Sequence, residues 1–401
     1  MPATPEPGAD PIQLMVDPAV AAAPQPFYAH LRDRCPVARS AGINGEAVFV
    51  SRHEDVSWAL RHPEVFSSAA EAVDIGQEQP LIPLQVDPPD HARYRRLLDP
   101  EFSPRTVATL EEEARVLVNR LIDRFADRGA CDFHEEFATP LPSTLFLTIA
   151  GLPHDDLPTF LRWRDNTIRP DVAPGDVEAA ARIRAQTSHE ISEYFTAAIA
   201  ERRARPDDRL LSRIVHAEVE GQRLSDTELL GICHLLLLGG LDTVTATLDC
   251  MIAYLARHPD RRRRIVEDPG RVPGAIEELL RWETPVQVVP RIVAQDVTLR
   301  DVTIPAGTHA VLVLGAANTD PAEFTGADVV DFDRPRNRHL AFGGGPHRCL
   351  GSHLARFELR VAIEEFHRRI PDYELAPGAE LRWSPGIRQA DALPLVWDPG
   401  R

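Results

Sequence analysis

Phe342-Gly-Gly-Gly-Pro-His-Arg-Cys-Leu-Gly351 places one cysteine, Cys349, between a glycine-rich loop and the start of an apolar pattern. The pattern has the spacing of one helix face, at Leu350, Leu354, Phe357 and Val361. It predicts a helix from His353 to Arg369, which must end before Pro371. Unpaired amides and the dipole at the helix start favour a thiolate at Cys349, and the glycines let the backbone approach a bulky, flat group.

Two other kinds of site share parts of this pattern. Glycine-rich loops before helices also bind phosphate, but Gly343-x-Gly345-x-x-Arg348 lacks the third glycine. His347, Cys349 and His353 could belong to a zinc site, although no CxxC accompanies them and no fourth ligand is evident nearby. A charged, hydrogen-bonded thiolate is also the ligand that haem iron needs for O–O cleavage, and we favour that interpretation.

The motif Phe-Gly-x-Gly-x-His-x-Cys-x-Gly resembles the haem-binding loop of the cytochrome P-450 superfamily, the haem-thiolate monooxygenases. The resemblance covers the chain from about Phe27 to Trp397 and implies the triangular α-rich fold of that family. It implies haem b (iron protoporphyrin IX) as cofactor, O2 as co-substrate and Cys349 as the metal ligand. The other loop residues that match haem contacts are Phe342, Gly343, Gly345, His347 and Gly351.

The composition is that of a soluble globular protein, with 43% hydrophobic and 26% charged residues among 401. The net charge of −17 argues against a nucleic-acid or anionic-membrane surface, so we expect neither partner. An odd number of cysteines without paired spacing makes a disulfide scaffold improbable and indicates the cytoplasm: Cys35, Cys131, Cys233, Cys250 and Cys349. Residues 1–12 are predicted to be a disordered tail and residues 13–401 a single, monomeric domain.

Periodicity predicts a mainly α chain with small β-sheets. The strand-like runs are Ala47–Val50, Val288–Val293, His309–Leu314 and Leu393–Val396. The predicted helices are His53–Arg61, His91–Arg96, Leu110–Ala126, Asp176–Arg203, Asp226–Arg257, Pro273–Trp282 and His353–Arg369. The long apolar stretch Leu229–Leu255 is expected to be a buried core helix, because it has a polar interruption and no basic flanks.

That interruption is Gly239-Gly-Leu-Asp242-Thr243. A glycine and a carboxylate both disfavour a buried helix, so they indicate a local opening beside a ligand. Alternatively, Asp242 reaches solvent and Thr243 bonds back to the preceding turn. The resemblance implies the first option: Asp242 and Thr243 match the acid–alcohol pair that delivers protons beside the haem, and Gly239 also contacts the haem. The substrate would then lie against Leu235, Leu238 and Gly239.

Two further groups of charged residues match family motifs. In isolation Glu278-x-x-Arg281 is a common helix-surface pair, but it resembles the structural Glu-x-x-Arg signature. Arg334 is then the expected third partner, with Arg336 as second choice. His91 and Arg95 share a helix face, which without context is a solvated cationic face. By resemblance they contact the haem propionates, together with Arg291 and His347.

The resemblance implies a monooxygenase that receives electrons from a separate ferredoxin and an NAD(P)H-dependent ferredoxin reductase. A basic patch for an acidic ferredoxin is expected at Arg93, Arg96, Arg348, Arg356 and Arg360. The alternatives are a peroxide-driven peroxygenase and a non-catalytic haem-binding protein; the intact Asp242-Thr243 pair argues against the first.

By family position, the substrate pocket also includes Val286, Val289 and Ile387, all of them apolar. A hydrophobic terpenoid, steroid or polyketide is therefore expected as substrate. The polar candidates around this pocket are Gln79, Gln287 and Arg388. If Arg388 points inward, an acidic substrate is expected.

Overall fold

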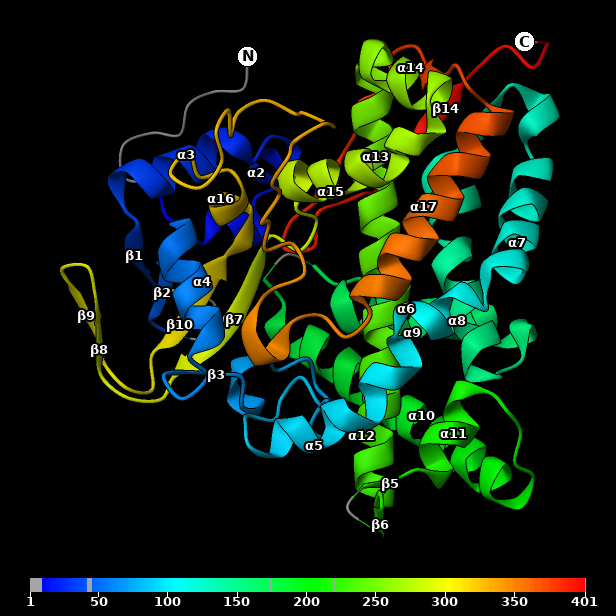
Figure 1. The fold of residues 1–401 in the computed structure, drawn as a ribbon. Coiled ribbons are helices and arrows are strands. Elements are labelled where there is room, and N and C mark those ends of the chain that lie inside the picture. The colour runs from blue at the N-terminus through cyan, green and yellow to red at the C-terminus, as the bar shows by residue number, and fades with distance from the viewer. Residues whose placement is uncertain (1–8, 42–44, 174, 220, 401) are drawn as a thin grey trace.

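The computed structural model describes residues 9–41, 45–173, 175–219 and 221–400. Helices dominate, and α12 and α13 run through the middle of the molecule as one nearly continuous column (Figure 1). The α-helices are α1 Gln13–Val16, α2 Pro18–Ala22, α3 Gln25–Arg34, α4 His53–Arg61, α5 Asp90–Leu98, α6 Pro104–Ala108, α7 Glu111–Asp123, α8 Pro140–Ala150, α9 Leu157–Ile168, α10 Val177–Ala204, α11 Leu210–His216, α12 Asp226–Leu241, α13 Thr243–Arg257, α14 Pro259–Glu267, α15 Val272–Glu283, α16 Leu314–Asn318 and α17 Ser352–Arg369.

The largest sheet has the strand order β1-β2-β10-β7-β3 and lies on one side of the molecule, together with α3, α4 and α16 (Figure 1). Only its β2–β10 pair is parallel among the pairs that the structure describes. Its strands are β1 Val37–Ser40, β2 Ala47–Val50, β3 Phe66–Ser67, β7 Val288–Val293 and β10 His309–Val313. The smaller sheets consist of β4 Ala130–Asp132, β5 Glu218–Val219, β6 Gln222–Arg223, β8 Val297–Leu299, β9 Val302–Ile304, β11 Glu374–Leu375, β12 Trp383–Ser384, β13 Gln389–Ala390 and β14 Pro394–Val396.

The central column begins with a complete capping box. The Glu228 amide donates to Ser225 Oγ at 3.3 Å, and Glu228 Oε2 accepts from the Ser225 amide at 2.7 Å. The segment Asp226–Arg257 is long and apolar enough to cross a membrane, yet 67% of its most apolar window is buried inside the protein. Such burial is typical of the core helix of a globular protein, as the sequence predicts.

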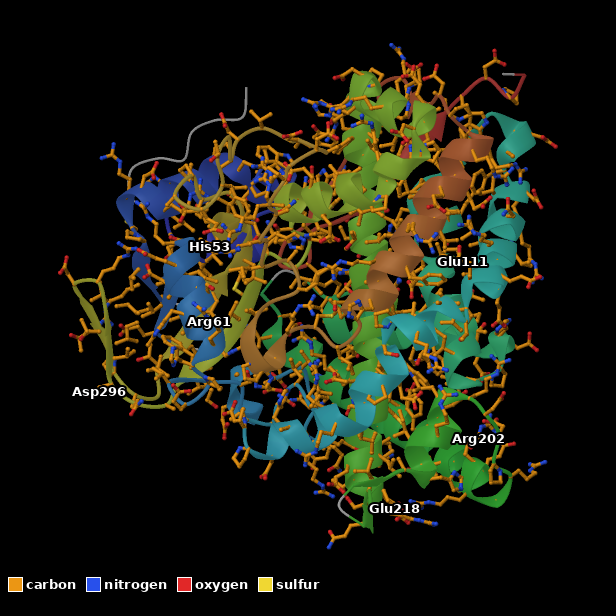
Figure 2. The ribbon with its side chains drawn as sticks, viewed as in Figure 1. His53, Arg61, Glu111, Arg202, Glu218 and Asp296 are labelled. Atoms are coloured by element: carbon orange, nitrogen blue, oxygen red, sulfur yellow. The ribbon has the colours of Figure 1, made fainter. Side chains whose placement is uncertain are left out.

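Apolar clusters surround this column on both sides. One joins α7, α13, α15 and α17, and a second joins α5 with the α8–α12 region. Charged side chains stand on several sides of the surface, as the labelled Glu111, Arg202 and Glu218 show (Figure 2). The loop that precedes α17 lies between the sheet side and the helical side of the molecule (Figure 1).

The predicted element types agree with the structure, with differences mainly at the ends. α4, β2 and β7 have the predicted bounds. The column is not one helix: α12 ends at Leu241, and α13 starts at Thr243. The strand predicted to end at Leu314 ends at Val313, because Leu314 begins α16.

The packed part of the chain begins before residue 13. Residues 1–8 of the predicted disordered tail lie outside the described residues. Within the rest of that segment, Ala9 and Ile12 pack against an apolar cluster, and Asp10 Oδ1 accepts a hydrogen bond from Ser40 Oγ at 2.6 Å. The described end of that segment is therefore packed against the rest of the protein.

Candidate functional site

The cysteine loop, residues 342–351, is closed by backbone hydrogen bonds. The Cys349 amide donates to Phe342 O at 2.9 Å, and the Gly343 amide donates to Leu340 O at 2.8 Å. Gly343 and Gly345 have φ of +65° and +63°, a region that glycine enters without strain. A Cβ on Gly345 would lie 2.1 Å from Leu60 O, so the loop can sit against α4 only with glycine at this position.

The Cys349 thiol has opposing influences on its ionisation. It lies three residues before α17 rather than at the helix start, and protein atoms crowd the sulfur although the residue has exposed surface. Burial raises the pKa of the thiol, whereas the Gly351 amide and the nearby guanidinium groups, Arg95 first among them, oppose the rise. A metal cation bound to the sulfur would favour the thiolate.

In this loop and beside it lie three buried basic side chains whose hydrogen-bond donors are incompletely satisfied. The rings of His91 and His347 are 4.3 Å apart between centroids, and within the described residues neither Nε2 has a hydrogen-bond partner. Arg291, which is 6% exposed, donates to Pro290 O at 2.7 Å and forms no ion pair with any described residue. The nearest carboxylate, Asp87, has its Oδ1 3.6 Å from His347 Nε2 and accepts from Ser67 and Ser68 instead.

Burial dominates the ionisation of this group. It lowers the pKa of His347 to about 4, with a smaller contribution from His91 and Arg291, and it lowers the pKa of His91. The pKa of Arg291 falls to about 10 for the same reason. An anion placed among these side chains would reverse the trend and supply the missing acceptors.

Arg95 differs from the other predicted propionate contacts because it already has partners. Its Nε donates to Asp99 Oδ1 at 2.7 Å and its Nη1 donates to Arg348 O at 2.7 Å. It therefore ties α5 to the cysteine loop.

Asp242 occupies the single residue that separates α12 from α13. It is fully buried, and Arg169 donates to both of its carboxylate oxygens, with Nη1–Oδ2 at 3.2 Å. Arg164 Nε lies 4.0 Å from Oδ1. The alternative in which Asp242 reaches solvent is wrong, since the carboxylate is buried and paired. Nothing in the sequence identified Arg169, which stands 73 positions earlier.

Thr243 and Gly239 lie one helical turn apart at the same opening. Thr243 Oγ1 donates to Gly239 O at 2.9 Å, which is the back-bonding predicted as an alternative. This bond uses the hydroxyl proton and leaves oxygen lone pairs to accept a proton or a hydrogen bond. A Cβ on Gly239 would meet no atom within 4 Å, so open space adjoins the helix at this position.

Glu278, Arg281 and Arg334 meet in a buried network. Arg281 donates to both oxygens of Glu278, at 2.8 and 2.9 Å, and Arg334 donates to the same oxygens at 3.1 and 2.9 Å. Both arginines also donate to the Val329 carbonyl, each at 3.0 Å. The Asn337 side chain donates to Glu278 Oε2 at 3.0 Å. The network thus connects α15 to the segment before the cysteine loop.

The predicted pocket residues come from three parts of the chain. Val286 and Ile387 form an isolated β-bridge, and Val289 follows in β7. Leu235 and Leu238 lie on α12, about two turns and one turn before Asp242, respectively. The apolar residues are therefore supplied by the core column and by segments that flank the large sheet.

Two of the predicted polar pocket residues are used elsewhere. Arg388 is 3% exposed, pairs with Glu283, donates to Ala21 O at 2.6 Å and lies 4.0 Å over the Trp383 ring. Gln287 donates to Tyr28 Oη at 2.8 Å. Arg388 is thus committed to a structural network, which removes the basis for expecting an acidic substrate.

A family model described as Cytochrome P450 matches residues 19–369. The chain belongs to the cytochrome P450 family. It is 36% identical to mycinamicin IV hydroxylase/epoxidase of Micromonospora griseorubida, over 92% of this chain and 94% of that protein. It is 35% identical to steroid C26-monooxygenase of Mycobacterium tuberculosis, over 93% of each. CYP109E1 of Bacillus megaterium, solved with testosterone, superposes with a TM-score of 0.88 at 29% identity, over 95% of this chain and 99% of that one.

Membership of the P450 family establishes the general chemistry. The chain is a monooxygenase with the α-rich P450 fold, a haem held by a cysteine thiolate and O2 as co-substrate. It acts on a hydrophobic small molecule and receives electrons from a redox partner. These findings confirm the predicted fold class, activity and cofactor, and they replace the phosphate and zinc alternatives.

The residues of this P450 chain fit such a haem. Arg291 and the Nε2 atoms of His91 and His347, which lack hydrogen-bond partners among the described residues, suit the two carboxylates that haem b carries. A Cβ on Gly351 would meet no atom within 4 Å, as at Gly239, so backbone on both the cysteine loop and the core column borders open space. The donor set and the flat, glycine-lined surfaces therefore agree with the family cofactor.

The basic patch expected beside the cysteine loop is weaker than predicted. Arg356 forms a bidentate pair with Glu277, at 2.6 and 2.8 Å, and Arg93 lies 3.2 Å from Glu228. Arg360 donates to Glu111 and Glu364. At least these three of the five arginines carry compensated charge, so the patch depends more on Arg348 than the sequence indicated.

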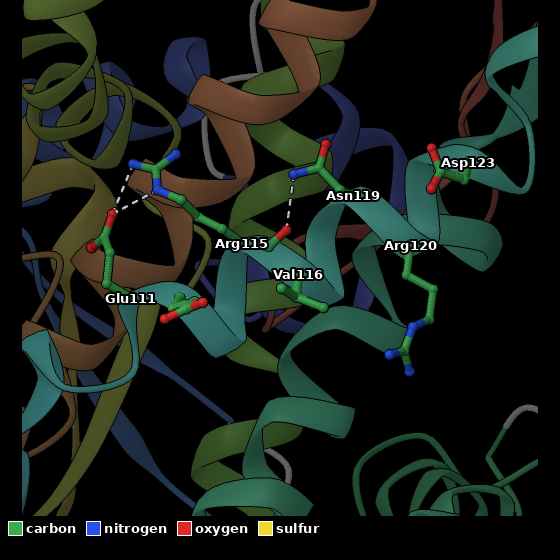
Figure 3. Close-up of a pocket in the computed structure, with 7 residues that line it drawn as sticks. Glu111, Arg115, Val116, Asn119, Arg120 and Asp123 are labelled. Carbon is green, nitrogen blue, oxygen red and sulfur yellow. Dashed lines mark hydrogen bonds and ion pairs between the residues drawn. The ribbon is translucent and has the colours of Figure 1, made fainter.

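A hollow of about 710 Å³ over α7 is separate from this site (Figure 3). All its lining residues belong to α7: Glu111, Glu112, Arg115, Val116, Asn119, Arg120 and Asp123. Arg115 pairs with Glu111 at 2.8 Å, and Asn119 donates to Arg115 O at 2.9 Å. The hollow contains no residue of the cysteine loop or the core opening.

Proposed function

We propose that Cys349 is the thiolate ligand of the haem iron and that His91, His347 and Arg291 bind the haem propionates. The observation that carries this proposal is the group of buried, unpaired basic side chains next to the single cysteine of the family loop. When bound, the haem supplies the oxygen activation and the oxygen transfer. Phe342, Gly343, Gly345 and Gly351 shape the loop against it.

Asp242 and Thr243 deliver protons in this proposal. Asp242 accepts a proton from the solvent side, where Arg169 is 28% exposed, and passes it toward Thr243. The Thr243 hydroxyl donates its own proton to Gly239 O, which leaves an oxygen lone pair free to accept the incoming proton. Thr243 then releases its original hydroxyl proton toward the open space at Gly239. Arg169 keeps the Asp242 carboxylate ionised until the ion pair between the two side chains opens.

The substrate is proposed to be a bulky hydrophobic molecule of the steroid, terpenoid or polyketide class. The contact residues are Leu235, Leu238, Gly239, Val286, Val289 and Ile387. Apolar side chains supply this surface, and Arg388 and Gln287 are bound elsewhere, which supports a substrate without a carboxylate. The steroid named for one relative and the testosterone bound by another make a steroid the first compound to test.

We further propose a ferredoxin, reduced by an NAD(P)H-dependent reductase, as the electron donor in the cytoplasm. Arg348 is exposed within the cysteine loop and offers a positive contact for an acidic ferredoxin. Because Arg356 and Arg360 are ion-paired, replacing Arg348 with alanine should slow reduction more than the same change at Arg360. Equal rates for the two variants, or rates that do not depend on salt, would remove this docking surface.

The central test is spectroscopic. The reduced, haem-loaded protein should show a strongly red-shifted Soret band under carbon monoxide, and Cys349→Ser should lose that band. Titration with steroids, terpenoids and polyketides should then displace iron-bound water for one class and shift the spin state. If the serine variant keeps the band, Cys349 is not the ligand.

A further inference from the structure

Arg356, in the second turn of α17, lies against the first residue of the cysteine loop. Its guanidinium carbon is 4.4 Å from the centroid of the Phe342 ring. A cation at this distance is attracted by the electron-rich face of the ring. The Phe342 carbonyl in turn accepts a hydrogen bond from the Cys349 amide at 2.9 Å. Phe342 thus contacts the guanidinium through its ring and the cysteine through its backbone.

Glu277, on α15, fixes the Arg356 side chain. Its Oε1 and Oε2 accept from Arg356 Nε and Nη2 at 2.6 and 2.8 Å, which makes the pair bidentate. The remaining nitrogen, Nη1, donates to Ser352 O at 3.3 Å. Because all three guanidinium nitrogens are bonded, the positive charge is held beside the cysteine loop in one position.

His339 ties the same carboxylate to the segment that enters the loop. Its Nδ1 accepts from the Ala341 amide at 3.2 Å, so the ring proton is on Nε2, which donates to Glu277 Oε2 at 3.0 Å. The centroid of the His339 ring is 6.0 Å from that of Phe342. Glu277 therefore bonds to two side chains that both contact the Phe342 ring.

We propose that Arg356 and Glu277 are positioning residues that set the reduction potential of the haem iron, and this inference rests on the proposed ligation of that iron by Cys349. One electron from the redox partner converts Fe(III) to Fe(II) and makes the iron–thiolate unit more negative by one charge. The Arg356 guanidinium stabilises the more negative state and raises the potential. The Glu277 carboxylate partly neutralises the guanidinium and limits this rise. Neither side chain gains or loses a proton.

A pair of the same chemistry lies farther along α17 and serves as a matched control. Arg360 pairs with Glu111, and its guanidinium carbon is 5.7 Å from the centroid of the Phe357 ring. Its side chain is 31% exposed, compared with 28% for Arg356. Phe357 belongs to α17 and not to the cysteine loop. Arg360 is therefore a similar cation displaced by one helical turn, about 6 Å along the helix axis.

The experiment measures the midpoint potential of the haem-loaded protein by a redox titration followed by absorbance. Arg356→Leu should lower the equilibrium constant for one-electron reduction about three- to tenfold, a fall of roughly 30 to 60 mV at 59 mV per tenfold change. Glu277→Gln should raise the potential, because it leaves the guanidinium without its counter-charge. Arg356→Lys keeps the positive charge and should retain most of the original potential. Arg360→Leu should leave the potential close to that of the original chain.

The opposite signs distinguish a charge effect from a structural one. A loosened loop would shift the potential in the same direction in Arg356→Leu and in Glu277→Gln. Shifts of equal sign, no shift in either variant, or an equal shift in Arg360→Leu would overturn the inference.

The reduced carbon monoxide spectrum separates this inference from the proposed ligand. If Cys349→Ser loses the red-shifted band and the potentials of the Arg356 and Glu277 variants do not move, the inference fails and Cys349 remains the ligand. If the serine variant keeps the band, the proposed ligand fails and the inference fails with it.

Discussion

Two buried clusters of charge flank the cysteine loop, and they are satisfied in opposite ways. In the Glu278 cluster, one carboxylate accepts from Arg281, Arg334, Asn337 and the Asp331 amide, and both Glu278 and Arg281 are fully buried. In the His91–His347–Arg291 cluster, neither histidine Nε2 has a hydrogen-bond partner among the described residues, and Asp87 Oδ1 comes no closer than 3.6 Å to His347 Nε2. The first cluster is complete as folded protein, and the second fits a missing anionic partner.

The comparison shows how a structural network is distinguished from a ligand site. Both clusters are charged, buried and close to the same loop, so neither charge nor burial separates them. Hydrogen-bond satisfaction does, because an unpaired buried cation is costly and persists only where a ligand offsets it.

The largest effect is expected when the complete cluster is broken. Glu278→Ala leaves two buried guanidinium groups without their carboxylate and should lower the free energy of unfolding by about 3–5 kcal/mol. Urea denaturation of the protein without haem, followed by circular dichroism, measures this loss.

Glu111→Ala is the matched control, since Glu111 pairs with Arg115 (Figure 3) and also with Arg360, but is partly exposed. This variant should lower the free energy of unfolding by no more than about 1 kcal/mol. Equal losses for both variants would show that burial does not set the strength of the Glu278 cluster.

A smaller effect of opposite kind is expected in the unpaired cluster. Arg291→Leu removes a buried cation that lacks an anion, so the unfolding free energy of the haem-free protein should stay the same or rise by about 1 kcal/mol. Haem affinity should fall about 10- to 100-fold, as expected for one lost charged hydrogen bond. Haem titration monitored by absorbance and by denaturation separates the two quantities.

Arg334→Leu is the contrasting variant: it should lower the unfolding free energy of the haem-free protein, because it removes a partner of the buried Glu278 carboxylate. If Arg291→Leu were equally destabilising, Arg291 would be a structural residue rather than a propionate contact.

The smallest effect concerns Glu277, the neighbour of Glu278 on α15. Burial raises its pKa, but hydrogen bonds from Arg356 and His339 outweigh this and lower the pKa to about 2. The carboxylate therefore stabilises the fold above pH 4.5, and this contribution is lost as the pH falls toward 2. Its size should be about 1–2 kcal/mol after solvent screening.

Glu277→Gln should thus differ from the original chain at pH 6 and converge with it near pH 2. The difference in unfolding free energy across this range is the measurement. A constant difference at all pH values would mean that the carboxylate charge contributes nothing.

Local patterns predicted much of the fold and the site. The apolar period of α17, the proline that follows it and the capping box of α12 are all local patterns, so the predicted start of α12 and the predicted bounds of α17 are close to the observed ones. The helix α8 was not predicted because its own apolar residues are distributed around the whole helix. Its sequence therefore lacks the one-sided apolar period by which the other helices were predicted. Element ends shifted where two elements adjoin, as at Leu314.

Long-range partners could not be predicted in the same way. The sequence marks the Asp242 carboxylate as unusual in an apolar helix, but its partner Arg169 was found only in the folded chain. Arg388 was considered a pocket residue, although packing directs it to Glu283 and Ala21. Which side of a segment faces the pocket depends on tertiary packing, and spacing alone does not encode it.

The bond from Arg388 to the Ala21 carbonyl joins positions 367 residues apart. Trimming the chain from its amino end past α2 would strip an acceptor from a guanidinium that stays buried beside Glu283 and Trp383. Shortened versions prepared for crystallisation should therefore retain residue 9 onward, and affinity tags are better joined ahead of that point than substituted for it.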